Sequence, residues 1–344
     1  MDKRNFIAGS IIVVSVMMSS FAFYFWQILF NPNVLMEQPD QTIAIPKEAT
    51  FKEVQNMLYD NRIVNDLVSF SFLAKLKNYD SNIKPGVYAL KSNMTNIEAI
   101  NLLRSGAQTP IKITFTNVRK LDELPERIAQ FMEFETEELK ALMLNDTTAA
   151  YYGFSPETFL SMFIPNTYEV YWTDTPKKML DRLKNEYDKF WTSERIELAR
   201  SIGMTANEVS TLASIVQAED TQMKESGRIA GVYVNRLRRG IPLQADPTVV
   251  YAVGDFSIRR VLTTHTKTKS PYNTYANKGL PPGPINMPSI AALQSVLNFE
   301  NHNYLYFCAK ADFSGYHTFA TNLQAHNKNA RDFQRAMDSQ RIFK

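Results

Sequence analysis

The chain has 344 residues, of which 44% are hydrophobic and 21% charged, and its formal net charge is +3. This composition is ordinary for a globular protein, and the length allows two or three modest domains. The small charge and the absence of a long basic block or a glycine-rich phosphate loop argue against a nucleic-acid-binding protein.

The cysteine and histidine content gives no indication of redox or metal chemistry. The single cysteine, Cys308, cannot form an internal disulfide, and its place in the apolar run 304–309 predicts a buried strand residue. The four histidines are His265, His302, His317 and His326. No two of them have the spacing of zinc ligands, so we expect neither a metal ion nor another cofactor.

The N-terminal segment predicts a membrane anchor. Residues 6–30 are almost entirely apolar, and about 20 apolar residues suffice to cross a bilayer as a helix. Lys3 and Arg4 precede this run and no basic residue follows it closely, so the positive-inside rule places residues 1–5 in the cytoplasm and the later residues outside. A cleaved signal peptide is the alternative. The length of the run and the lack of a small-x-small cleavage site argue against it.

A small αβ module is predicted after the anchor. Residues 31–42 are polar, contain two prolines and are typical of a linker. Within 43–115, the predicted strands are 43–45, 86–90 and 111–115, and the predicted helices begin near 51, 64 and 97. Thr50 suits the start of the first helix, and Thr95 with Glu98 forms a capping box before the last. No cluster of reactive side chains occurs here, which favours a binding module over an enzyme.

Unusual polar and aromatic positions become dense only in the C-terminal part of the chain. Residues 116–204 predict a mostly helical connecting region, and the denser part spans 205–344. Thr205 and Glu208 form another capping box, which starts a helix with an apolar stripe at helical spacing.

Glu219 projects along one edge of that stripe, where apolar side chains would half enclose it. Loss of water raises the pKa of a carboxyl, and a carboxyl that stays protonated near neutral pH can act as a general acid. The alternative is an ordinary helix-end glutamate, exposed or paired with Lys224 or Arg228. The residues alone favour this alternative.

The segments after Glu219 supply further polar groups. Asp246 suits the N-cap of a short helix with Pro247 as its first residue, a structural role that needs no catalysis. The loop 270–275 combines asparagine, threonine and tyrosine, which offer the hydrogen bonds and ring faces that a sugar chain needs. A hairpin is predicted across 304–320, and Thr321 suits the cap of a final helix.

Six short motifs occur in the order and with the spacing of one known family. They are Leu212–Glu219, Val234–Leu237, Leu243–Thr248, Tyr272–Tyr275, Gly279–Pro284 and Tyr304–Phe307. Together they closely resemble the endolytic murein transglycosylases, or YceG-like proteins, over residues 43–335. The resemblance implies an α+β protein with a transmembrane helix at 6–30, a LysM-like module at 43–115 and a mixed helical and β catalytic domain at 205–344.

Three positions depart from the family pattern. Gln217 stands where many members carry another glutamate, which indicates that this position is not essential for the chemistry. Asn166 replaces the aspartate of a Pro-Asp-Thr-Tyr turn, and Asn117 with the two residues after it replaces an earlier Glu-Gly. The last two departures affect only local loop geometry.

The resemblance implies a lytic transglycosylase that cleaves the β-1,4 bond between N-acetylmuramic acid (MurNAc) and N-acetylglucosamine (GlcNAc), with Glu219 as the catalytic residue. A glycoside hydrolase normally needs two carboxylates, whereas a lytic transglycosylase can work with one. Glu219 would protonate the glycosidic oxygen and then take the proton of the muramic acid C6 hydroxyl, which attacks C1. The product is a 1,6-anhydro-MurNAc end.

Further polar residues are candidates for holding sugars or orienting Glu219. They are Asn235, Gln244, Asp246, Tyr272, Asn273, Thr274, Tyr275, Asn322 and His326. One alternative is a true muramidase with Asp246 or Asp220 as the second carboxylate. Another is a non-catalytic wall-binding scaffold for synthesis enzymes, which the retained Glu219 and its motifs disfavour.

The resemblance also implies where the protein acts and with what. The expected substrate is the peptidoglycan strand newly made beside the membrane, and the expected role is to end strand elongation near peptidoglycan synthases. The expected location is the cell membrane, with a single span, a cytoplasmic N-terminus and the catalytic domain outside the cytoplasm.

Overall fold

The computed structural model describes residues 3–35, 40–116 and 118–339 and forms two compact units. The first unit runs to Ile113 and includes Phe131–Glu133 and Tyr168–Asp174, and the second contains the other described residues. Helices and two-stranded sheets occur together, which confirms the predicted α+β class. Residues 1–2 of the predicted tail, 36–39 of the predicted linker, and Asn117 lie outside the described residues.

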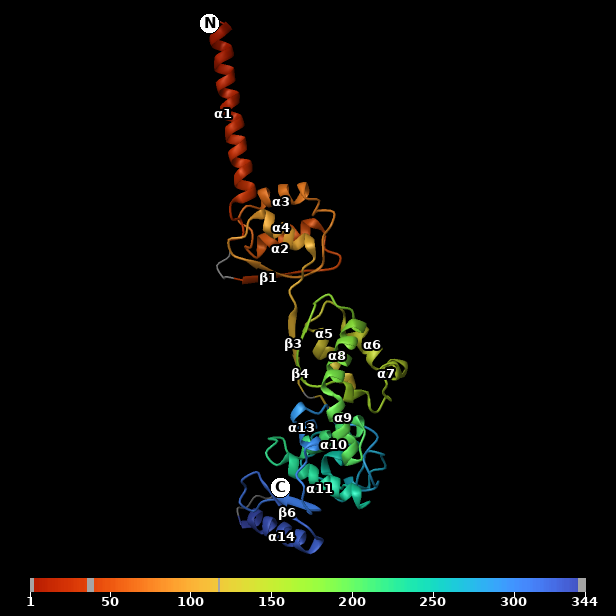
Figure 1. The fold of residues 1–344 in the computed structure, drawn as a ribbon. Helices are drawn as coiled ribbons and strands as arrows, with labels where there is room; N and C mark the ends of the chain where they lie inside the picture. The colour runs from red at the N-terminus through yellow and green to blue at the C-terminus, as the bar shows by residue number, and fades with distance from the viewer. Residues whose placement is uncertain (1–2, 36–39, 117, 340–344) are drawn as a thin grey trace. The chain divides into compact units, whose positions relative to one another are not determined.

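The first unit follows a strand–helix–helix–strand–helix order after its N-terminal helix (Figure 1). Its elements are α1 (Lys3–Phe30), β1 (Asp40–Ile45), α2 (Phe51–Asp60), α3 (Leu67–Leu76), β2 (Gly86–Lys91) and α4 (Asn96–Ser105). β1 and β2 pair antiparallel, with Gln41 opposite Leu90 and Ile45 opposite Gly86. The next sheet pairs β3 (Ile111–Phe115) with β4 (Asn166–Val170).

Local capping sets the helix starts of this unit. Thr50 and Thr95 head reciprocal capping boxes, which confirms both predicted starts. The second helix begins at Leu67, three residues later than predicted, because the Asp66 side chain accepts from the backbone N–H groups of Val68 and Ser69. The apolar faces of the three helices meet in one core that includes Phe70, Leu58 and Tyr88.

α1 contains the predicted membrane span. Its segment Phe6–Phe30 has a mean hydropathy of 2.1, and none of its most apolar window is buried inside the protein. A core helix of that composition would be covered by other elements. Within the described residues, this is the one helix long and apolar enough to cross a membrane.

The described end of the predicted linker packs into the first unit. Val34 is 0% exposed and pairs with Val64. The Asn33 side chain accepts from the Asp66 N–H at 2.7 Å and donates to Asn96 Oδ1 at 2.7 Å. The linker prediction does not hold for Asn33 and Val34, because these hydrogen bonds tie the end of α1 to the module.

The second unit is mostly helical up to a C-terminal hairpin. Its helices are η1 (Leu121–Glu123), α5 (Leu124–Ala129), α6 (Thr136–Met143), α7 (Asp146–Tyr151), η2 (Phe159–Met162), α8 (Pro176–Phe190), α9 (Ser193–Ile202), α10 (Ala206–Glu219), α11 (Ser226–Arg238), α12 (Asp246–Val253), η3 (His265–Lys267), α13 (Ile290–Leu297) and α14 (Leu323–Ser339). β5 (Tyr306–Ala309) and β6 (His317–Ala320) form the predicted hairpin. Most of the predicted connecting region thus belongs to the same unit as 205–344.

α10 is enclosed by other helices of this unit. It packs against α9, α11, α12 and α13, and all residues from Val209 to Val216 are buried. The predicted capping box of Thr205 and Glu208 is present. Ser214 accepts from the Ile285 N–H at 3.0 Å and its carbonyl accepts from the Asn286 side chain at 2.7 Å, so the segment after Gly279–Pro284 is clamped onto the helix.

A glycine brings α11 close to the segment before the hairpin. A Cβ atom at Gly231 would collide with the Glu300 carbonyl oxygen and the His302 ring. The Asn235 side chain strengthens the same contact by donating to the carbonyl oxygens of His302 and Tyr304 at 2.7 and 3.1 Å. This close approach on one face of α11 fixes the rotation of the helix about its axis, and with it the direction of Tyr233 on the nearly opposite face.

Two predicted helix caps are displaced by one residue. α12 has Ala245 as its N-cap and Asp246 as its first helical residue. Asn322 and not Thr321 caps the final helix, because its Oδ1 accepts from the Ala325 N–H at 2.9 Å. The N-cap prediction for Asp246 is therefore wrong, and its carboxylate is left for another role.

Candidate active site

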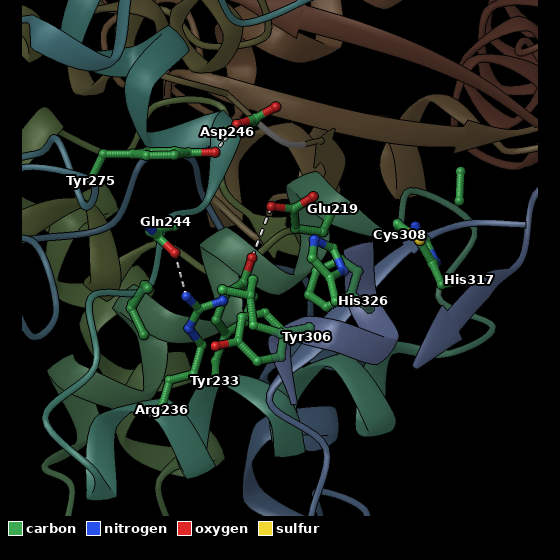
Figure 2. Close-up of a pocket in the computed structure, with 14 residues that line it drawn as sticks. Glu219, Tyr233, Arg236, Gln244, Asp246, Tyr275, Tyr306, Cys308, His317 and His326 are labelled. Carbon is green, nitrogen blue, oxygen red and sulfur yellow. Dashed lines mark hydrogen bonds between the residues drawn. The ribbon is translucent and has the colours of Figure 1, made fainter. Parts of the chain in front are cut away.

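Glu219 ends α10 and faces a pocket of the second unit (Figure 2). α11 places Tyr233 against it, and the Tyr233 hydroxyl donates a hydrogen bond to Glu219 Oε1 at 2.8 Å. Tyr233 is 1% exposed, whereas Glu219 is half-buried. The carboxyl is thus surrounded by protein but keeps one side open to a ligand.

Burial raises the pKa of Glu219 from 4.5 to about 7. The Tyr233 hydrogen bond opposes this rise because it favours the ionised form, and the negative charge of Asp246 adds to it. A carboxyl with such a pKa holds its proton in about half of the molecules at neutral pH. It can therefore both donate and accept a proton there.

The alternative interpretation of Glu219, an ordinary helix-end glutamate that is exposed or ion-paired, does not fit this geometry. Arg228 pairs instead with Glu300 at 2.9 Å. The Lys224 ammonium lies 5.4 Å from the centre of the Tyr316 ring. In the described part of the chain, no basic side chain forms an ion pair with Glu219.

Two pockets meet at Glu219. The first has a volume of about 470 Å³ and the second about 310 Å³. Glu219 and Asp246 are the two side chains that line both. The first pocket adds Tyr275, Tyr306 and Phe307 to its wall, and the second adds Tyr251 and Phe256. A carboxyl pair therefore stands where two aromatic-lined pockets join.

Asp246 is held at this junction by Tyr275, whose hydroxyl donates to Asp246 Oδ1 at 2.6 Å. Asp246 is exposed and also raises the pKa of Glu219 by its charge. The other candidate second carboxylate, Asp220, is 9% exposed and accepts from the Glu225 N–H at 2.6 Å. Asp220 lines neither pocket and serves as the C-cap of α10.

Arg236 is a buried cation in the wall of the first pocket. It is 7% exposed and donates to Gln244 Oε1 and to the Leu305 carbonyl oxygen. The backbone of Gln244 has a φ of +50°, a left-handed conformation that residues other than glycine rarely adopt. Its N–H donates to the Thr274 carbonyl oxygen at 3.1 Å, so Arg236 and Thr274 hold this residue from two sides.

Besides Glu219, four of the residues predicted to hold sugars or orient it line the first pocket: Gln244, Asp246, Tyr275 and His326. The His326 ring stacks on Tyr306 at 5.2 Å, and burial followed by the charge of Arg236 lowers its pKa. This places the early turns of α14 over the hairpin strand β5.

The other predicted candidates line neither pocket that contains Glu219; they are Asn235, Tyr272, Asn273, Thr274 and Asn322. Asn273 and Thr274 are buried and bond to neighbouring backbone and to Thr248. The Tyr272 ring packs on Tyr251 at 4.7 Å. The YNTY motif thus shapes the loop that carries Tyr275.

Gln217 has a structural role in this protein. Its side chain donates to Asn286 Oδ1 at 3.0 Å and to the Met287 carbonyl at 3.2 Å, and accepts from the Ser289 N–H at 2.8 Å. Asn166 is exposed at the start of β4. Neither residue lines a pocket with Glu219.

Sequence reasoning missed Tyr233, Arg236, Tyr306 and His317 as members of the site. Tyr233 is 14 positions from Glu219 in the sequence and belongs to an apolar stripe of α11 with Ile229 and Val232. Its one distinguishing signal was a hydroxyl in that stripe, which must find a partner when buried. Cys308, predicted as a buried strand residue, is half-buried on β5 and lines the first pocket.

Known proteins are similar to this chain over most of its length. The model of the YceG-like family matches residues 43–332. The endolytic murein transglycosylase of Streptococcus pneumoniae strain D39 is 30% identical over 327 residues, covering 85% of this chain and 58% of that protein. The endolytic murein transglycosylase of Bacillus subtilis strain 168 is 28% identical, covering 89% of this chain and 88% of that protein.

A solved structure is also similar. The crystal structure of a YceG-like protein from Listeria monocytogenes has a TM-score of 0.57 and 26% identity, covering 84% of this chain and 98% of that one. The chain spans 58% of the length of the Streptococcus relative and most of the Bacillus relative. The family model covers far more than half of the sequence. The chain belongs to the YceG-like family.

Proposed function

We propose that this protein is an endolytic lytic transglycosylase of peptidoglycan, with Glu219 as its catalytic acid and base. The observation that carries the proposal is the half-buried Glu219, whose pKa is raised to about 7 at the junction of two pockets. The names of the Streptococcus and Bacillus relatives support the same reaction class.

The reaction needs one carboxyl that acts twice. Protonated Glu219 gives its proton to the glycosidic oxygen as the bond from C1 of MurNAc to O4 of GlcNAc breaks. The resulting carboxylate removes the proton of the MurNAc C6 hydroxyl while O6 bonds to C1. Glu219 ends protonated, the product carries a 1,6-anhydro-MurNAc end, and no water is consumed.

Tyr233 and Asp246 would tune this cycle. The Tyr233 hydrogen bond occupies Oε1 of Glu219, which leaves Oε2 to carry the reacting proton. The Asp246 carboxylate places negative charge beside the bond that breaks, where positive charge develops at C1. Its hydrogen bond from Tyr275 fixes that charge in place.

The two pockets support cleavage within a strand. An enzyme that cuts inside a glycan chain must bind sugars on both sides of the broken bond. Pockets that share Glu219 and Asp246 but differ in all other lining residues offer this arrangement. Their aromatic side chains provide ring faces among a few polar groups, as is common in ligand sites.

Hydrolysis is the second candidate because Asp246 lines both pockets with Glu219. In that case Asp246 would activate water or attack C1, and the new end would be reducing muramic acid. Mass spectrometry of purified glycan strands digested with the full-length protein separates the two reactions. Anhydro ends are expected; reducing muramic acid ends would overturn the transglycosylase mechanism in favour of hydrolysis.

The first unit fits a supporting role in the same proposal. We expect α1 to be the single membrane span, with the N-terminus in the cytoplasm and the second unit outside it. The β1–α2–α3–β2 order with its antiparallel strand pair supports a LysM-like glycan-binding module. An enzyme held there would meet strands as they leave peptidoglycan synthases, and its cuts would end their elongation.

A further inference from the structure

An exposed apolar stripe runs along α3. Val68, Phe72 and Leu76 are 75%, 49% and 61% exposed. Their spacing of four residues places them on one face of the helix, while Phe70, Leu73 and Ala74 fill the core on the other. A contiguous apolar face on a helix that is already packed on its opposite side indicates a second binding partner.

α3, which carries the stripe, lies beside the C-terminal end of α1 within the same unit (Figure 1). The Phe72 ring meets the Phe25 ring edge to face, with 6.4 Å between centroids. Phe25 is five residues before the end of the span, so Phe72 lies about 7–8 Å along the helix axis from that end. The stripe is therefore level with the last turns of the segment proposed to cross the membrane.

Several contacts fix α3 relative to α1. Ile28 of α1 is 7% exposed and belongs to the core that α3 completes. The Asn96 side chain donates to the Ile28 carbonyl oxygen at 3.1 Å and to Ser69 Oγ at 3.1 Å. The Asn33 side chain donates to the Asp66 carbonyl oxygen at 2.9 Å. These bonds place the stripe at a set depth and orientation beside the span.

We infer that the Val68–Phe72–Leu76 face of α3 inserts into the outer leaflet of the membrane that α1 crosses. The lipid acyl region fits because the stripe continues the apolar surface of α1 through Phe25. Amphipathic helices in this position bury their apolar face about 5–10 Å deep at the headgroup boundary. The exposed Lys75 beside the stripe can reach lipid phosphates with its ammonium.

This inference rests on the proposed membrane span and adds a second lipid contact to it. Its consequence is orientation: one span alone leaves the first unit free to tilt against the membrane surface, whereas a second insertion fixes which face of the unit points away from the lipid. That face would then be presented to glycan strands at a constant height.

The test uses the full-length protein reconstituted in phosphatidylethanolamine–phosphatidylglycerol vesicles. In a Cys308→Ser background, single variants Val68→Cys and Leu76→Cys receive an environment-sensitive fluorophore. Tyr59→Cys is the matched control, because Tyr59 is a large exposed side chain (62%) on α2 of the same unit. Quenching by lipids with a nitroxide near the headgroup is compared with quenching by aqueous iodide.

We expect lipid quenching at least threefold stronger at positions 68 and 76 than at position 59, with the reverse order for iodide. Equal lipid quenching at the three positions would overturn the inference. Protection from iodide without lipid quenching would also overturn it, since a protein partner or second copy would then cover the stripe. A Val13→Cys label tests the span itself: its failure to meet deep nitroxides would refute the anchor, while its quenching without effects at 68 and 76 would refute only the α3 contact.

Discussion

α10 carries a glutamate near each of its ends, and the two carboxylates have opposite surroundings. Near the N-terminus, Glu208 is exposed and accepts from the Thr205 N–H at 2.7 Å and from its hydroxyl at 2.9 Å. At the C-terminus, Glu219 is half-buried and accepts one hydrogen bond from Tyr233. The first is a cap and the second faces two pockets.

The surroundings of a carboxyl, and not its residue type, therefore decide what it can do. The helix N-terminus favours negative charge through its free N–H groups, while the C-terminus disfavours it. At Glu219, burial and the nearby Asp246 act in the same direction as the helix end and raise the pKa to about 7. Four measurements test whether burial and local charge cause this difference between Glu208 and Glu219.

The largest expected effect is on the rate. Glu219→Gln removes the proton that Glu219 gives and accepts, so we expect strand cleavage to fall by about 10²–10⁴-fold, the usual contribution of general acid–base catalysis. Glu208→Gln is the matched control on the same helix and should change the rate less than about twofold. Anhydro-muropeptide release from purified strands measures both. An active Glu219→Gln enzyme would assign the chemistry to another group.

The next effect is on stability. Unfolded Glu219 loses its proton near pH 4.5, whereas in the folded protein it keeps it until about pH 7. The unfolded state then binds fewer protons between these values, so the wild type loses up to about 3 kcal/mol of unfolding free energy as pH rises from 4.5 to 7.

Glu219→Gln should escape this loss and exceed the wild type in thermal stability at pH 8, with a smaller difference at pH 4. Calorimetric melting of both proteins over this pH range is the measurement. Glu208→Gln should follow the wild-type pH trend. A parallel trend in wild type and Glu219→Gln would show that the raised pKa is not the cause.

A smaller effect concerns the pH profile. Above the pKa of Glu219 the acid is lost and the rate falls. Tyr233→Phe removes a hydrogen bond that lowers this pKa, so the alkaline limb should move up by roughly one pH unit. Asp246→Asn removes a charge that raises it, so the limb should move down. If the alkaline limb of the kcat profile moved in the same direction in both variants, these assignments would be contradicted.

The smallest effect tests the other end of the helix. Thr205→Ala removes the oxygen that accepts from the Glu208 N–H at 3.3 Å and should cost about 1 kcal/mol of unfolding free energy. Denaturant unfolding measures this cost. The alkaline limb of the rate should stay in place, because the cap lies at the opposite end of α10 from Glu219. A shifted limb would indicate that the whole helix, and not local burial, controls the pKa.

Local features were predictable where a short segment contains its own partners. The capping boxes predicted at Thr95 and Thr205 and the helix start predicted at Thr50 all occur where expected, and in each the structure pairs residues three positions apart. The hairpin of β5 and β6 and the long apolar helix follow from patterns within one segment. The caps of α12 and α14 were off by one residue: α12 begins after Ala245 without a side-chain cap, and in α14 the neighbouring polar residue Asn322 takes the place predicted for Thr321.

The site was predictable only in part for a related reason. Motif order selected Glu219, and residue type selected Tyr275 and Asp246, which the structure joins by a 2.6 Å hydrogen bond. The same residue types also selected Asn273 and Thr274, which are buried in scaffold hydrogen bonds. The position of a polar residue in the sequence does not reveal whether its side chain faces a pocket or is buried in hydrogen bonds to the backbone.

The apolar N-terminal segment, the helix starts at Thr50, Thr95 and Thr205, and a glutamate at the end of an apolar helix all followed from the sequence, because each depends on residues close together in the chain. The tertiary structure alone decided that this glutamate meets Tyr233 from another helix and lies beside Asp246. It also decided that α3 turns an apolar face outward beside α1. The burial of a side chain and the charges near it depend on segments that are far apart in the sequence, and only tertiary packing brings these segments together.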